Sequence, residues 1–202
     1  ARLRADYGIL GEGERLPDLL AVLAAGDTEG AARLPGVLVG TNAKEPPRPW
    51  SGASARQLAS AKTVGQYLRW GGMLNVQTKR GCPFRCTYCT YPAIEGRALR
   101  LFDPEDVARE WETLARAGAK FLFVTDAVFN SHVHHNLVVA DALVRRGLTI
   151  PWGAFFAPLR PPAGYYRRLR EAGLTHAEFG TESLAAPMLR AYRKPFTVEH
   201  AL

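Results

Sequence analysis

From residue 73 onward, short apolar runs alternate with segments of helical periodicity. The apolar runs have the length of strands and lie at 73–78, 121–126, 150–156 and 177–180. The helical patterns lie at 103–117, 136–146, 164–172 and 185–192. Strands that alternate with helices predict βαβ units around a parallel sheet, and right-handed crossovers curl such units into a barrel or a doubly wound sheet. We therefore expect an α/β core of about four βα units over residues 73–202.

The first 40 residues carry a weaker version of the same pattern. Apolar strands are predicted at 7–10 and 35–39, with a helix at 16–24 between them. We interpret residues 1–40 as the tail of an α/β, Rossmann-like domain whose beginning lies upstream. Residues 41–72 include a proline-rich run and are predicted to be a linker that packs partly on its neighbours. Because both ends fall inside structured patterns, we expect a piece of a longer protein.

Composition narrows the class of protein only slightly. The 202 residues are 47% hydrophobic and 22% charged, as in an ordinary globular protein. The net charge of +7 would suit an anionic partner such as nucleic acid. The arginines, however, are spread along predicted helices and form no basic tail, so we expect solvated helix faces and no nucleic-acid binding. The sequence contains no run of eighteen apolar residues, so it predicts no membrane span.

All three cysteines of the chain, Cys82, Cys86 and Cys89, follow the first predicted strand of the core. Three thiols cannot all pair as disulfides, a structural zinc site needs four ligands, and bacterial ferredoxins use another spacing with a fourth cysteine. Chemistry in parallel sheets lies at the carboxyl ends of the strands, where we expect this loop. Three cysteines suggest a cluster with one iron open to a non-protein ligand, and zinc or another cluster is the alternative.

Three histidines, His132, His134 and His135, are candidates for a fourth metal ligand. Their spacing matches no zinc finger, and the adjacent His134 and His135 cannot face one site from a helix. We predict that they lie at the surface or at the rim of the site.

The spacing CxxxCxxC, with Tyr88 directly before the last cysteine, resembles the radical S-adenosylmethionine (SAM) superfamily. The resemblance implies a partial (β/α) barrel in which Cys82, Cys86 and Cys89 hold three irons of a 4Fe-4S cluster. It also implies that the fourth iron binds SAM, and that one electron cleaves SAM to methionine and a 5′-deoxyadenosyl radical. An external one-electron reductant of the flavodoxin or ferredoxin type would be needed. Three free thiolates suit a reducing, cytoplasmic location.

The same resemblance points to five further cofactor-binding residues. Tyr88 matches the aromatic position whose backbone lies against the adenine. Asp126 stands where the family faces the methionine amino group, although a turn or cap residue is the equal alternative. Gly180, Glu182 and Ser183 form a Gly-x-Glu-Ser run that faces the SAM ribose and carboxylate, with a turn before the next helix as the alternative.

Several short runs are similar to the cobalamin-associated branch of that superfamily. These are the Asp-x-x-Phe-Asn run at 126–130, the Gly-x-Glu-Ser run at 180–183 and the Lys-x-x-Thr run at 194–197, the last predicted to be structural. Residues 11–14 resemble the end of a cobalamin-binding domain. The resemblance implies cobalamin in the full-length protein and methyl transfer, or related radical chemistry, on a substrate that the residues do not identify. The rival hypothesis is a non-enzymatic α/β binding module stabilised by zinc or a cluster, with nucleic acid as a candidate partner.

Overall fold

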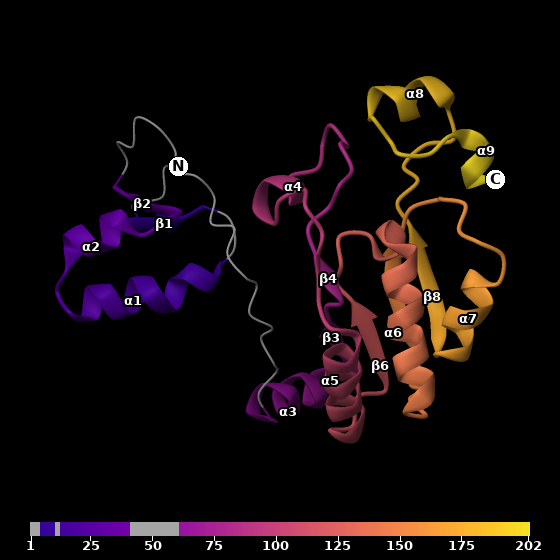
Figure 1. Cartoon of the computed structure of the whole chain (residues 1–202), viewed down its shortest axis with the longest axis horizontal. Helices are drawn as coiled ribbons and strands as arrows, with labels where there is room; N and C mark the ends of the chain where they lie inside the picture. The colour runs from indigo at the N-terminus through magenta and orange to yellow at the C-terminus, as the bar shows by residue number, and fades with distance from the viewer. Residues whose placement is uncertain (1–4, 11–12, 41–60) are drawn as a thin grey trace. The chain divides into compact units, whose positions relative to one another are not determined.

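The structure, a computed structural model, describes residues 5–10, 13–40 and 61–202. The chain divides into two compact units, residues 1–55 with 93–96 and residues 56–92 with 97–202 (Figure 1). Residues 11 and 12, which belong to the run likened to a cobalamin domain, lie outside the described residues. So do residues 41–60 of the predicted linker.

In the first unit, two short strands enclose two helices. β1 (Tyr7–Ile9) pairs antiparallel with β2 (Val37–Val39). Between them lie η1 (Gly13–Arg15), α1 (Leu16–Ala24) and α2 (Thr28–Arg33). Leu19 of α1, Ala31 of α2 and Val37 of β2 form a small core, because each of these elements turns an apolar side chain inward. The strands and the helix lie close to the predicted ranges, while the antiparallel pairing is a detail that the sequence pattern did not predict.

The second unit is built on a four-stranded parallel sheet in the order β3-β6-β7-β8. The strands are β3 (Met73–Val76), β6 (Phe121–Val124), β7 (Trp152–Phe156) and β8 (Leu174–Phe179). Strands that neighbour each other in the sheet are also consecutive along the core, as expected when each crossover has the same hand. The carboxyl ends of all four strands meet at one edge. This arrangement confirms the predicted α/β core of four βα units.

Three helices cover one face of this sheet, namely α5 (Pro104–Arg116), α6 (Val133–Arg145) and α7 (Tyr165–Glu171) (Figure 1). Alternate strand residues such as Leu122, Val124 and Ala154 are fully buried in the core that these helices share with the sheet. Trp111 of α5 meets Trp152 of β7 edge to face, with ring centroids 5.6 Å apart. The helix α3 (Ala61–Trp70) packs on β3, so the end of the predicted linker is part of this unit.

Shorter elements complete the carboxyl edge. β4 (Lys79–Arg80) and β5 (Arg100–Leu101) form a two-stranded antiparallel pair, which the sequence pattern did not predict. The short helix α4 (Tyr91–Ile94) lies between them in sequence. After β8 come α8 (Ala186–Ala191) and α9 (Val198–Ala201). The cysteines lie in the segment enclosed by β4 and β5.

Candidate cluster and cofactor site

The cysteine loop leaves the sheet after β3 and is closed by the β4–β5 pair. Gly81 has a φ of 90°, a left-handed conformation that glycine adopts without steric cost, and it turns the chain out of β4. Arg97 donates to the Phe84 carbonyl at 2.8 Å, and the Cys89 amide donates to the Cys86 carbonyl at 3.3 Å. The loop is therefore held at its base and across its middle, at the carboxyl edge of the sheet.

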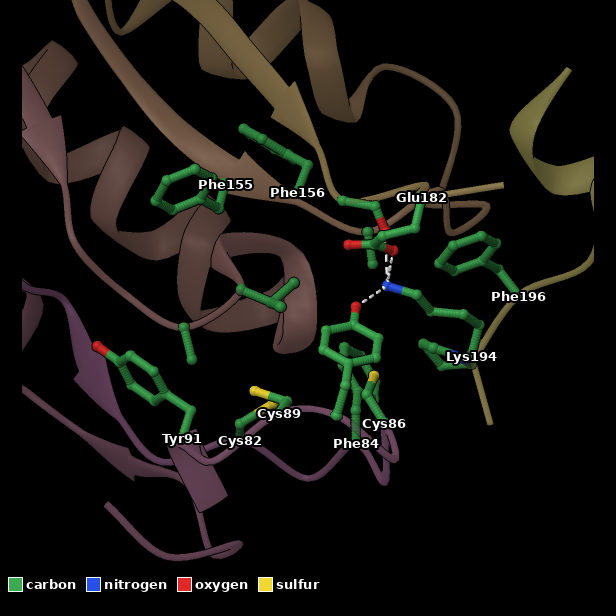
Figure 2. A pocket seen from close by; sticks show the side chains of 16 residues that line it. Cys82, Phe84, Cys86, Cys89, Tyr91, Phe155, Phe156, Glu182, Lys194 and Phe196 are labelled. Carbon is green, nitrogen blue, oxygen red and sulfur yellow. Dashed lines mark hydrogen bonds and ion pairs between the residues drawn. The ribbon is translucent and has the colours of Figure 1, made fainter. Parts of the chain in front are cut away.

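A pocket of about 220 Å³ opens beside this loop (Figure 2). Most of the predicted site residues line it, namely Cys82, Cys86, Cys89, Tyr88, Gly180 and Glu182. They come from the loop after β3 and from the turn after β8, which are the two outer strands of the sheet. Asp126 and Ser183 are not among the lining residues. Tertiary structure thus brings together two predicted groups that are far apart in sequence.

The walls of the pocket are aromatic on several sides. Phe84 comes from the cysteine loop, Phe155 and Phe156 from β7, and Phe196 from the segment after α8. Phe155 also packs edge to face on Phe123 of β6, with ring centroids 5.0 Å apart. Apolar walls exclude water and lower the local dielectric, which strengthens each electrostatic contact inside.

The three thiols differ in exposure although they line one pocket. Cys82 is buried, Cys86 is partly buried and Cys89 is exposed. Burial raises the pKa of Cys82 and of Cys86, because a thiolate is poorly solvated there. The nearby Lys194 ammonium acts in the opposite direction on the pKa of Cys86. Burial thus favours the protonated form of Cys82 and Cys86, and metal binding at this loop must displace these protons.

The donor set fits an iron–sulfur cluster better than a single zinc ion. Within the part of the chain that the structure describes, no three Cys, His, Asp or Glu side chains gather closely enough to hold one metal ion. A cluster does not need such convergence, because each thiolate binds a different iron. Three thiols on one pocket wall can hold three irons of a cluster and leave one for a ligand from outside the protein. This geometry disfavours the zinc-stabilised alternative.

Lys194 is a pocket residue that the sequence reasoning treated as structural. Its ammonium donates to Tyr88 Oη at 2.5 Å and to the Gly180 carbonyl at 2.9 Å, and it forms an ion pair with Glu182 (Figure 2). These partners lie on the cysteine loop and on the turn after β8. The signal in the sequence was the Lys-x-x-Thr run at 194–197, which was predicted to be structural. Lys194 therefore connects the two predicted groups of site residues.

Asp126 follows the end of β6, and its side chain is buried among protein atoms. Its carboxylate accepts from the Thr78 amide at 2.8 Å, Thr78 Oγ1 at 2.5 Å, the Lys79 amide at 3.2 Å and Lys79 Nζ at 2.6 Å. A carboxylate offers about four acceptor sites, so these donors occupy it. The geometry favours the turn-type, structural role over a direct contact with a cofactor amino group.

The rest of the Asp-x-x-Phe-Asn run extends the same buried network. Lys79 Nζ also donates to the Phe129 carbonyl at 2.7 Å. The Asn130 side chain donates to the Ala157 carbonyl at 2.8 Å and accepts from the Ala157 amide at 2.9 Å. The run therefore connects the segments that follow β3, β6 and β7 by hydrogen bonds. These segments include the residues that lead into the cysteine loop.

A family model described as the Radical SAM superfamily matches residues 76–202. The match covers more than half of the chain and includes the cysteine loop, the pocket and Lys194. The chain belongs to the radical SAM superfamily. This membership confirms the predicted superfamily.

Curated relatives of this radical SAM chain include several methyltransferases. Tryptophan 2-C-methyltransferase of Streptomyces laurentii is 32% identical over 81 residues, which are 40% of this chain and 14% of the relative. Hopanoid C-3 methylase of Methylococcus capsulatus is 24% identical over 202 residues, which are 94% of this chain and 37% of the relative. The chain thus spans only a minor part of the length of these relatives.

Solved structures share the fold. TsrM from Kitasatospora setae, a radical SAM methyltransferase solved with cobalamin and a 4Fe-4S cluster, superposes with a TM-score of 0.77 at 23% identity, over 97% of this chain and 43% of that one. OxsB, a cobalamin-dependent SAM radical enzyme solved with aqua-cobalamin and SAM, gives a TM-score of 0.77 at 19% identity, over 94% of this chain and 30% of that one. At these identities the likeness establishes the radical SAM fold.

Ser183 sits in the turn between β8 and α8. Its hydroxyl accepts from the Ala185 amide at 3.0 Å, a local contact typical of turns that precede a helix. This contact matches the turn that stood as the alternative, and the role of Ser183 in SAM binding stays a prediction.

The three histidines do not share one environment, and the prediction of a surface or rim position is wrong for His135. His135 is buried, and its Nε2 lies 3.1 Å from the Thr78 carbonyl, so Nε2 carries the proton that is donated. Burial lowers the pKa of His135. His134 is exposed, as predicted, and His132 caps α6 by accepting from the His135 amide at 3.1 Å.

The described helices include none that is both long and apolar enough to cross a membrane.

Proposed function

We propose that this chain forms the cluster-binding part of a radical SAM enzyme, with Cys82, Cys86 and Cys89 as ligands of three irons of a 4Fe-4S cluster. The observation that carries the proposal is the set of three thiols on one wall of an apolar pocket at the carboxyl edge of a parallel sheet. When bound, the cluster supplies one electron to SAM, and reductive cleavage of the S–C5′ bond yields methionine and a 5′-deoxyadenosyl radical.

The opposite wall of the pocket would orient SAM. Glu182 is part-exposed toward the pocket and can accept hydrogen bonds from the ribose hydroxyls. Gly180 has no side chain, so the backbone of this turn can approach the nucleoside closely. Tyr88 presents its ring and backbone from the cysteine loop to the adenine. Asp126 and Ser183 contribute indirectly, by holding the loop base and the turn.

The aromatic walls have a protective role in this proposal. Phe84, Phe155, Phe156 and Phe196 reduce the access of water to the space between the thiols and Glu182. Exclusion of solvent would keep the cofactors in a low-dielectric space and would limit side reactions of reactive intermediates there. The apolar lining also strengthens the charge-assisted contacts of Glu182 and Lys194.

We further propose that the full-length enzyme uses cobalamin for methyl transfer. Support comes from the methyltransferases among the relatives and from the cobalamin bound in the two similar solved structures. Titration of the full-length protein with hydroxocobalamin, followed by absorbance after gel filtration, tests this. About one retained cobalamin per chain supports the proposal, and complete loss on filtration contradicts it.

A soluble electron carrier of the flavodoxin or ferredoxin type would deliver the electron. The net charge of +7 favours association with an acidic protein of this kind. The three thiols must stay reduced in order to bind iron. This proposal therefore includes a cytoplasmic location for the enzyme.

The decisive experiment is anaerobic reconstitution with iron and sulfide. We expect about four iron and four sulfide per chain, and no cluster when Cys82, Cys86 and Cys89 are all replaced by alanine. Far-ultraviolet circular dichroism checks that the metal-free variant keeps its helices. Release of 5′-deoxyadenosine from SAM under reducing conditions then tests the reaction. Stoichiometric zinc without iron, or a cluster undiminished by the triple substitution, would contradict the assignment.

A further inference from the structure

The segment after α8 reaches back to the cysteine loop through Lys194, whose three ammonium protons all have acceptors. These acceptors are Tyr88 Oη, the Gly180 carbonyl and the Glu182 carboxylate. The Lys194 side chain is only 5% exposed. A long lysine side chain loses much conformational freedom when it is held in this way, so the contact is specified by the surrounding structure.

The same segment contacts the loop by other means. The Thr87 amide donates to the Tyr192 carbonyl at 3.1 Å, and Thr87 Oγ1 lies 3.4 Å from the Ala191 carbonyl. The rings of Tyr88 and Tyr192 meet edge to face, with centroids 5.6 Å apart. The middle of the cysteine loop is therefore docked on the end of α8 by backbone, ring and charge contacts together.

Glu182, the ion-pair partner of Lys194, and Arg193, the residue directly before Lys194, both adopt costly backbone conformations. Among the described residues, Glu182 and Arg193 are the non-glycine residues with positive φ, at 56° and 53°. The Arg193 amide donates to the Arg190 carbonyl and the Lys194 amide to the Leu189 carbonyl, both at 3.0 Å. This is the Schellman pattern at the end of α8, where glycine is the usual residue. Strain of this kind persists where neighbouring contacts impose it and concentrates at functional sites.

The Lys194 cation stays charged in its apolar surroundings. Burial alone would lower the pKa of Lys194, but hydrogen bonds with Glu182 and Tyr88 outweigh burial, and the pKa is raised. The ammonium also lies 5.1 Å from the centroid of the Tyr88 ring and 5.7 Å from that of Phe196. A fixed positive charge is thus built into the wall between the cysteine loop and the turn after β8.

We propose that Lys194 is a positioning residue, which holds Tyr88 and Glu182 in the places from which they contact SAM and keeps the cysteine loop docked before the cofactors bind. This inference rests on the proposed function, in which Tyr88 and Glu182 contact SAM. Lys194 pairs with Oε2 of Glu182, and a carboxylate offers about four acceptor sites, so Glu182 can also accept from a ribose hydroxyl. Lys194 needs no contact with SAM of its own.

The test is Lys194→Met in the full-length protein, because methionine keeps the apolar stem and removes the charge. In the metal-free protein, we expect amide hydrogen exchange at 82–89 to become about tenfold faster, with exchange in α5 and α6 unchanged. After anaerobic reconstitution, we expect the affinity for SAM to fall about tenfold. The reason is that Tyr88 and Glu182 each lose a charge-assisted hydrogen bond with Lys194. Lys194→Arg keeps the charge and should recover part of both effects.

The matched control is Arg190→Met, which removes an exposed cation from α8 and makes the same change in net charge. We expect wild-type exchange and wild-type affinity for SAM in this control. Wild-type behaviour of Lys194→Met, or equal effects in both variants, would overturn the positioning role. A wild-type protein that assembles no cluster would instead overturn the proposed function and the SAM part of this inference, while loop exchange in the metal-free protein would still decide whether Lys194 docks the loop.

Discussion

Two lysine–carboxylate pairs flank the cysteine loop, and they differ in what surrounds them. Lys79 and Asp126 lie below the loop, and both side chains are 1% exposed. Lys194 and Glu182 lie beside the pocket, where Lys194 is 5% and Glu182 is 38% exposed. Protein donors occupy both oxygens of Asp126, whereas Glu182 lines the pocket with its carboxylate.

The difference between the two pairs shows how position assigns a role to the same chemical groups. A fully buried pair is tolerated only when its hydrogen bonds are complete, and removing one partner leaves an uncompensated charge. In the second pair the Glu182 carboxylate is partly exposed and has water as an alternative partner, so the pair adds less to stability. It can, however, exchange part of its contacts for a ligand. We therefore expect the Lys79–Asp126 pair to control stability and the Lys194–Glu182 pair to control cofactor binding.

The largest expected effect comes from breaking the buried pair. Asp126→Asn leaves the Lys79 ammonium without its counter-charge, and we expect the free energy of unfolding to fall by about 3–5 kcal/mol. Urea unfolding followed by circular dichroism measures it. Asp141→Asn, at the partly exposed pair with Arg168, is the control and should cost less than about 1 kcal/mol. A similarly small loss for Asp126→Asn would show that the two pairs do not differ as we describe.

A smaller change in stability, with a clear change in binding, is expected at the pocket. Glu182→Gln keeps the size of the side chain and removes its charge, so the free energy of unfolding should change by at most about 1 kcal/mol. The affinity for SAM, measured by anaerobic titration calorimetry, should fall about tenfold. Glu171→Gln removes an exposed carboxylate on α7 and should leave binding unchanged. Unchanged SAM affinity in Glu182→Gln would remove Glu182 from the cofactor site.

The smallest effect is a pH dependence at the edge of the buried network. The unfolded chain binds a proton at His135 below about pH 6.5, while burial lowers the pKa of His135 in the folded protein. The unfolded state therefore binds more protons as the pH falls below that value, and stability decreases by up to about 1.4 kcal/mol per pH unit until the folded-state pKa is passed.

His135→Gln removes this proton uptake, so its stability should fall less than that of the wild type between pH 7 and pH 5. Urea unfolding at a series of pH values gives the two slopes. His134→Gln, on the exposed neighbour, should follow the wild type. Parallel slopes for wild type and His135→Gln would mean that His135 is not buried in the neutral form.

Much of the fold could be predicted from the sequence because its signals are local. The alternation of apolar runs with helical patterns over residues 73–202 predicted all four parallel strands, and the spacing of Cys82, Cys86 and Cys89 predicted a cluster loop at the carboxyl edge. The β4–β5 pair escaped prediction, since two-residue strands carry no periodicity. The burial of His135 escaped it too, because two adjacent histidines give no sign of which one faces the sheet.

The sequence by itself determined the secondary structure of the core, the cysteine spacing and the family. Each of these depends on residues that lie within a few positions of one another. Only the tertiary structure decided which charged groups meet. Lys79 and Asp126 are 47 positions apart, and Lys194 and Tyr88 are 106 positions apart. Whether a carboxylate is saturated by protein donors or open to a ligand depends on burial and on partners brought by distant strands. That physical difference separates Asp126 from Glu182, which looked alike as acidic residues after a strand.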